Sequence, residues 1–206
     1  MNELASQLLE LRDDPPRAGQ WAARCRGSDD QVRIAAASEC TADAVAHIER
    51  DGAVRALDRW PDASTLRRGD LVTVQVPASS APQFCEYLSS LARDLGSVDP
   101  SQRPTPFVFA PWCAEPQGIH RLWTVAAARI ALPSSVLVGA RHDLLGIRVA
   151  QVALGFGASA LVGPIEPDRS LPLAGVTRPT ENTRAGLRAL VEQVGLHVQP
   201  QPPAAN

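Results

Sequence analysis

The chain alternates apolar runs of strand length with segments of helical periodicity, and this alternation most limits how it can fold. Buried strands are predicted at residues 71–76, 107–111, 136–140 and 160–163. Helices are predicted at residues 79–96, 119–132, 147–156 and 183–194. Strands that alternate with helices form right-handed βαβ units with parallel pairing, and continuous Val, Leu and Phe runs are typical of strands buried on both faces. The pattern predicts an α/β fold.

The first third of the chain is less regular. Residues 4–26 have a helical pattern with a break at Pro15-Pro16, and residues 32–36 have the pattern of a strand. A helix is predicted over 43–50 and a short strand over 53–57. The whole sequence thus contains about six strands, which we assign to a single α/β domain at residues 1–198. Residues 199–206 are predicted to be a disordered tail.

Composition excludes several classes of function. The net charge of −2 does not indicate a nucleic-acid surface, and no apolar run approaches the length of a membrane span. The N-terminus lacks the pattern of a secretory signal, so we expect a cytoplasmic protein that binds neither membranes nor nucleic acid. All 20 basic residues are arginine. Without lysine, Schiff-base chemistry and the phosphate-binding P-loop are excluded.

The four cysteines are Cys25, Cys40, Cys85 and Cys113, and no two of them form a C-x-x-C pair. In a cytoplasmic chain of this size such cysteines are expected to be free thiols, several of them buried. A zinc site built from scattered cysteines and histidines is the alternative. We assign no metal and no cofactor to the chain.

The second half of the chain carries three motifs in a characteristic order. These are Phe109-Ala110-Pro111-Trp112, the helical run at residues 126–132 and the run Gln151-Val152-Ala153-Leu154-Gly155-Phe156-Gly157-Ala158. They resemble the last barrel units of radical S-adenosylmethionine enzymes of the futalosine menaquinone pathway, the dehypoxanthine futalosine cyclase and aminofutalosine synthase group. They also resemble deazaflavin-cofactor synthases. The resemblance implies a (β/α) barrel, which ordinarily takes about 250 residues.

The resemblance also shows what this chain lacks. The cluster-binding cysteines of the family, spaced C-x3-C-x2-C, would fall on Ala44, Ile48 and Asp51, and none of these is a thiolate ligand. The family's polar residue on the penultimate strand is replaced by Gly139, and its acidic or amide residues after the F-G-A turn are replaced by Ser159 and Ala160. The stretch before residue 71 is too short for the second to fourth barrel units. The implied fold is a shrunken or incomplete (β/α) barrel with about six mainly parallel strands.

Ligand sites of parallel α/β folds lie at the carboxyl ends of the strands, which selects three groups of residues. Arg141, His142 and Asp143 follow one strand, Trp112 and Cys113 follow another, and Glu39 follows the first. The first group could bind an anion or transfer protons; its alternative is a solvated loop with a local charge pair. Cys113 could be a nucleophile or a half-buried thiol, and a metal site shared with Glu39 is a further alternative.

Two functions remain open at this point. The first is a radical-SAM-like pseudoenzyme that binds a full-length family member or a second copy of itself. Its interface is expected at residues 4–11 and 53–57. The second is a small-molecule-binding protein, or an enzyme without a cluster, that uses Arg141, His142 and Asp143. A third arrangement, in which a partner subunit supplies an iron–sulfur cluster, is compatible with the same sequence.

Overall fold

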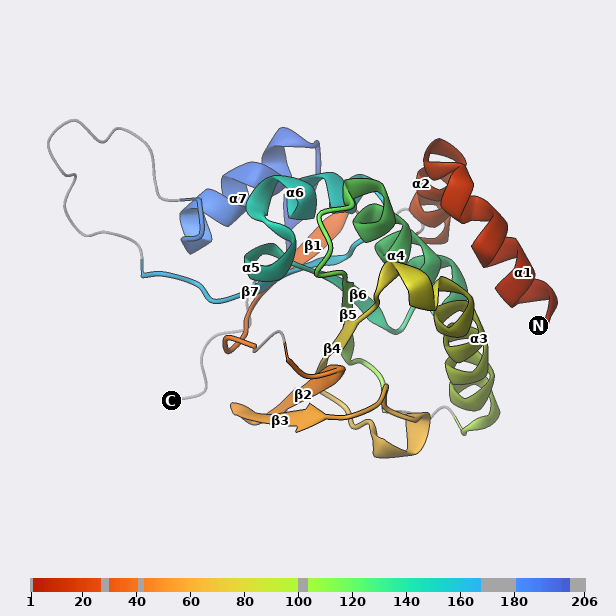
Figure 1. Ribbon diagram of the computed structural model, residues 1–206. Coiled ribbons are helices and arrows are strands. Elements are labelled where there is room, and N and C mark those ends of the chain that lie inside the picture. The colour runs from red at the N-terminus through yellow and green to blue at the C-terminus, as the bar shows by residue number, and fades with distance from the viewer. Residues whose placement is uncertain (1, 27–29, 41–42, 100–103, 168–180, 201–206) are drawn as a thin grey trace, which may run out of the picture.

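The fold is a mixed α/β arrangement built on one eight-stranded sheet (Figure 1). The computed structural model describes residues 2–26, 30–40, 43–99, 104–167 and 181–200. The strands are β1 Gln31–Ala36, β2 Ala46–Arg50, β3 Ala53–Leu57, β4 Leu71–Gln75, β5 Val108–Trp112, β6 Leu137–Arg141, β7 Ala160–Gly163 and β8 His197–Val198. The α-helices are α1 Glu3–Glu10, α2 Pro15–Arg26, α3 Ala81–Ser97, α4 Gly118–Ala131, α5 His142–Leu145, α6 Ile147–Gly155 and α7 Arg184–Gln193. Short 3-10 helices are η1 Leu11–Asp13, η2 Ala63–Thr65 and η3 Ala78–Ser80.

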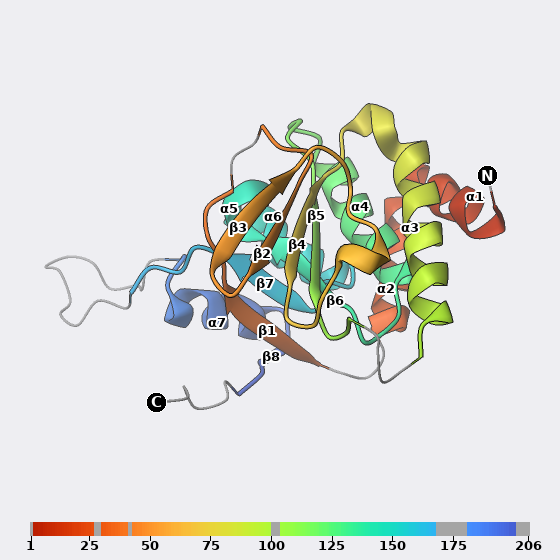
Figure 2. The same cartoon turned by 90° about the horizontal axis from the view of Figure 1, so that it is seen from below.

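The four strands predicted in the second two thirds of the chain are confirmed as parallel neighbours. The sheet order is β3-β2-β4-β5-β6-β7-β1-β8, so β4, β5, β6 and β7 follow one another in sequence and in space. The long helices pack against one side of this sheet (Figures 1 and 2). This is the side on which the main core lies, between strand residues such as Val72 and helix residues such as Phe84 and Trp123.

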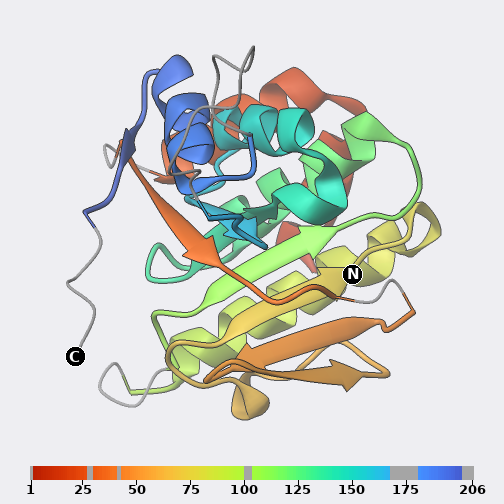
Figure 3. The same cartoon turned by 90° about the vertical axis from the view of Figure 1, so that its left-hand side faces the viewer.

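The sheet curls but does not close into a barrel. Its two ends are β3 and β8. Figure 3 shows β1 running across toward the β2–β3 hairpin. There Ser38, just after β1, donates from its backbone N and its Oγ to the carboxylate of Glu49 on β2, at 2.9 and 3.0 Å. A side-chain contact therefore bridges the two strands, without a β-ladder between them in the described residues.

A second, smaller apolar cluster fills the concave face of the curled sheet. Its members are Ala37, Leu71, Val108, Ala110, Ala160 and Val162. Gly139 lies among them on β6, and a Cβ atom there would sit only 2.9 Å from Val108 Cγ1 and 3.0 Å from Val162 Cγ2. The inside of the curl is thus packed with side chains, and small residues allow the strands to approach.

The N-terminal region corrects two predictions. The helix predicted over residues 43–50 is wrong, because β2 is a strand that pairs antiparallel with both β3 and β4. Asp51 and Gly52, with φ of 51° and 78°, form the two-residue turn that such a hairpin requires. The described residues contain eight strands rather than about six, since β2 and the short β8 add to those predicted.

Helix α1, expected from the sequence to contribute to an interface with a partner, instead packs against the protein's own helices. Its apolar side chain Leu8 is fully buried against the neighbouring helices, and the indole Nε1 of Trp123 donates to the Leu8 carbonyl at 2.9 Å. The predicted break at Pro15-Pro16 is confirmed: the helical segment is interrupted at Asp14, and Pro15 is the first residue of α2, where a missing N–H costs nothing. The apolar face of α1 is covered by the protein itself and is not free for a partner.

The end of the chain is tied to the sheet as far as residue 199. The backbone N–H of Gln199 donates to the Val32 carbonyl at 2.9 Å, which continues the β1–β8 pairing. The remainder of the predicted tail, 201–206, lies outside the described residues. Among the residues described, none of the helices has the length and apolar character needed to cross a lipid bilayer.

Candidate functional site

Arg141 is the last residue of β6 and is 1% exposed. It lies at the carboxyl ends of the parallel strands, the end of the curled sheet that we call the mouth. Its Nε and Nη2 donate to the two carboxylate oxygens of Asp143 at 3.1 and 2.6 Å. Nη1 donates to Cys40 Sγ at 3.0 Å and to Thr73 Oγ1 at 3.2 Å, and Nη2 also donates to the Ser38 carbonyl at 2.8 Å. A guanidinium has five N–H donors, and all five are used within the protein.

His47 on β2 and Cys40, in the segment before β2, are two titratable groups whose pKa values respond to this guanidinium. His47 pairs with Thr73 across the β2–β4 ladder and is 4% exposed. Burial, and then the charge of Arg141, lower the pKa of His47, so the imidazole is neutral at pH 7. Burial also raises the pKa of the Cys40 thiol, and this outweighs the opposing effect of Arg141. Cys40 is therefore a thiol that accepts a hydrogen bond rather than a reactive thiolate.

His142 begins α5 directly after Arg141 and is 4% exposed. Its Nε2 is buried without a hydrogen-bond partner among the described residues. Gly163, at the carboxyl end of β7, has φ of 148°, and a Cβ there would lie 2.7 Å from His142 Nε2 and 2.8 Å from Asp143 Oδ1. The glycine thus lets the β7 backbone pass close to both side chains. Burial lowers the pKa of His142.

Trp112 and Cys113 lie at the end of β5, as predicted, but they form a separate group. Both are buried, and Cys113 Sγ donates to Glu115 Oε2 at 2.6 Å. Burial and this carboxylate raise the pKa of Cys113 to about 11. Arg121 holds the loop by donating to the carbonyls of Cys113 and Glu115. No hydrogen bond among the described residues joins this group to Arg141, and a thiol of such high pKa is a poor nucleophile.

Glu39 is exposed and makes no hydrogen bond or ion pair with the described residues. The carboxylate that contacts the end of β1 is instead Glu49 on β2. Sequence reasoning missed Glu49 and His47 because it assigned their segment to a helix. A pattern in the sequence does indicate a hairpin strand here: Ala46 and Ile48 alternate with these polar residues, and the turn residues Asp51-Gly52 follow. This pattern would have predicted the positions of His47 and Glu49.

The three positions at which the sequence resemblance would place cluster cysteines carry no thiolate ligand. Ile48 lies within β2 and packs into the main core, while Asp51 is in the hairpin turn. Ala44, before β2, offers no ligand atom. Within the part of the chain that the structure describes, no group of three or more His, Cys, Asp or Glu side chains is arranged to hold a metal ion.

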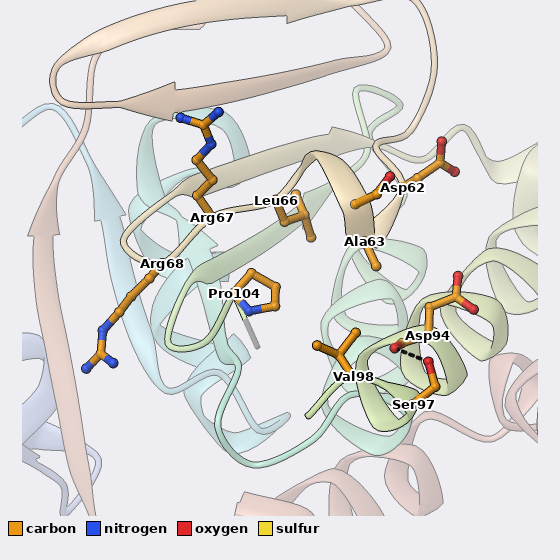
Figure 4. Close-up of a pocket in the computed structure, with 10 residues that line it drawn as sticks. Asp62, Ala63, Leu66, Arg67, Arg68, Asp94, Ser97, Val98 and Pro104 are labelled. Atoms are coloured by element: carbon orange, nitrogen blue, oxygen red, sulfur yellow. Dashed lines mark hydrogen bonds between the residues drawn. The ribbon is translucent and has the colours of Figure 1, made fainter. Parts of the chain in front are cut away.

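A cavity of about 760 Å³ lies at the other end of the sheet, beside the amino ends of β4 and β5 (Figure 4). Leu66, Val98 and Pro104 surround its centre, whereas Arg67 and Arg68 point away from them. This end of a parallel sheet is the one that serves stability rather than ligand binding. We therefore place the candidate site at the Arg141 mouth.

Comparison of the sequence with protein-family models gives no match, and comparison with curated proteins gives none either.

Proposed function

We propose that the protein is a non-catalytic, radical-SAM-like homologue that acts in the cytoplasm by binding another protein. The partner is a full-length member of the menaquinone enzyme group, or a second copy of this chain. The fold supports this reading, because an open, curled sheet of mainly parallel strands is what remains when units are removed from a (β/α) barrel.

The observation that carries the proposal is that every N–H donor of the Arg141 guanidinium is already used in a hydrogen bond within the protein. A residue that binds a substrate anion keeps N–H donors free for it, but here Asp143, Cys40, Thr73 and the Ser38 carbonyl take all five. The guanidinium therefore holds together three chain segments that meet at the mouth. This is a structural role in the place where the related enzymes carry out chemistry.

The packing inside the sheet supports the same reading. At Gly139 the family resemblance implies a polar side chain, and the Val108 and Val162 methyl groups leave no space for one. Deletion of barrel units also leaves an exposed edge strand, β3, at which the described sheet ends. An uncovered edge is a site for association with another chain.

Light scattering and co-purification test this proposal. The purified chain is measured by itself and then mixed with a full-length dehypoxanthine futalosine cyclase-type enzyme. We expect a stable homodimer or a stoichiometric complex. A chain that remains monomeric at micromolar concentration in both experiments would contradict the proposal.

His142 favours a second candidate function, the binding of a small molecule at the mouth. A buried imidazole nitrogen without a partner is uncommon, and a ligand that donates a hydrogen bond would satisfy it. Native mass spectrometry of the protein from its own host tests this. A co-purifying small molecule that His142→Phe abolishes and His197→Phe leaves in place would favour binding over the pseudoenzyme role.

A further inference from the structure

We propose that the outer edge of β3 binds an extended segment of the partner protein as an additional strand, with a carboxylate of that segment opposite Arg55. This inference rests on the proposed function and names the surface that carries it out. Strand β3 is the last strand of the sheet order, and no described strand pairs with its outer edge. Four of its five residues are exposed, and it lies at the lower margin of the sheet in Figure 3.

The hydrogen-bonding register shows which backbone groups the edge offers. Gln75 N–H donates to the Val45 carbonyl, so odd-numbered residues of this strand region bond to β4. In an antiparallel ladder the alternate residues, such as Ile48, then bond to the other neighbour, β3. Ile48 pairs with Arg55, which leaves the N–H and C=O groups of Val54 and Ala56 directed outward. Two N–H donors and two acceptors are thus available to an added strand.

A cavity of about 510 Å³ adjoins this edge on the side of the sheet that the helices cover elsewhere. Apolar side chains, among them Ile48, Leu57 and Pro61, line part of it, and three arginines, three aspartates and Thr65 line the rest. Arg50 is held by a two-point ion pair with the buried Asp70, at 2.7 Å for both contacts. This cavity can take the side chains of one face of an added strand.

The charge of Arg55 determines which kind of segment can bind at this edge. It is exposed at the middle of β3, lines the cavity and makes no ion pair with the described residues. Arg50 is neutralised by Asp70, and Arg59 lies 4.0 Å from Asp62. The unpaired charge at the centre of the edge therefore favours a segment with a carboxylate between apolar residues.

The same charge argues against a second copy of β3 as the occupant. An antiparallel pairing of two β3 strands with full overlap places Arg55 opposite Arg55 of the other copy. Like charges directly opposite each other destabilise a strand pair, and a central charge on an edge strand is a common protection against self-association. The occupant is accordingly a segment of a different protein.

Two labelled peptides test the proposal by fluorescence anisotropy. Each has seven alternating threonine and valine residues with blocked ends, and the central residue is glutamate in one and lysine in the other. We expect the glutamate peptide to bind at least about threefold more tightly, a difference that Arg55→Glu reverses. Ala56→Pro should weaken binding at least about tenfold, because it removes an outward N–H donor and leaves the bonds to β2 in place.

The control is Arg188→Glu, which reverses an exposed charge on α7 and should leave peptide binding unchanged. Circular dichroism establishes that each variant is folded. Equal affinity for the two peptides, or no binding of either up to about 1 mM, overturns the inference. If a complex with the full-length relative forms and survives both Arg55→Glu and Ala56→Pro, this inference fails while the proposed function stands. If neither a homodimer nor a complex with the full-length relative forms, the proposed function fails.

Discussion

Arg141 is a cation that the fold removes almost completely from water. Such a group is tolerated because Asp143 neutralises it and neutral acceptors take its remaining N–H donors. Removing one member of a buried ion pair leaves the other member uncompensated, which is more costly than losing the attraction between them.

We therefore expect Arg141→Met to lower the free energy of unfolding by about 3–5 kcal/mol. Urea denaturation followed by circular dichroism measures this loss. Arg148→Met is the matched control, because Arg148 pairs with Glu181 on the surface, where both side chains are largely exposed. Its effect should stay below about 1 kcal/mol. An Arg141→Met variant as stable as the wild type would show that the mouth does not depend on this guanidinium.

Three buried histidines predict how stability changes with pH. Burial lowers the pKa of His47, His120 and His142 in the folded state. Unfolded histidine has a pKa of about 6.5, so below that pH the unfolded chain binds more protons than the folded one. The contribution of these histidines to the stability is fully present above about pH 6.5 and is lost as the pH falls toward their folded pKa values.

Urea titrations at a series of pH values between about 7 and 5 test this linkage. The free energy of unfolding should fall with decreasing pH, by up to about 1.4 kcal/mol per pH unit for each histidine. His142→Phe should reduce the slope. The same replacement at the exposed His197 should leave the slope as it is. A pH-independent stability over this range would contradict the description of these side chains as buried neutral groups.

At the scale of elements, β5, β6 and β7 pack closely together at Gly139. A methyl group there would approach Val108 Cγ1 to 2.9 Å, so Gly139→Ala should destabilise the protein by about 1–3 kcal/mol through overpacking. Thermal and urea denaturation measure the cost. In the double variant with Val108→Ala the two effects should be less than additive, because the second change removes the nearest obstructing methyl group, Val108 Cγ1. Strict additivity of the two changes in unfolding free energy would show that there is no steric overlap between residues 139 and 108.

At the scale of the whole molecule, the proposed loss of radical chemistry predicts that no iron–sulfur cluster forms. Ala44, Ile48 and Asp51 stand where the family resemblance implies cysteine ligands. After anaerobic incubation with iron and sulfide, followed by desalting, the chain should retain less than one iron and show no thiolate-to-iron absorbance. Retention of about four irons per chain, lost on substitution of Cys25, Cys40, Cys85 and Cys113 together, would contradict the pseudoenzyme proposal.

The parallel core and its helices could be predicted from the sequence because their signals are local. Strands β4, β5, β6 and β7 are recognisable from their own Val, Leu and Phe runs, and the helices between them are recognisable from their amphipathic pattern. The position of Arg141 at a strand end follows from the same pattern. In this part of the chain local propensity and the final structure agree.

Only the tertiary structure decided the nature of the candidate site. His47 and Glu49 reach Arg141 and Ser38 because β2 turns back and pairs antiparallel with β4, a contact across more than 20 residues that no short window reveals. The five hydrogen bonds of Arg141 join segments from residues 38 to 143. Sequence by itself determined which elements form in the parallel core from β4 to β7, because propensity and apolar period act over a few residues. Which side chains meet depended on the curl of the sheet, because burial and hydrogen bonding are settled only when distant strands pack together.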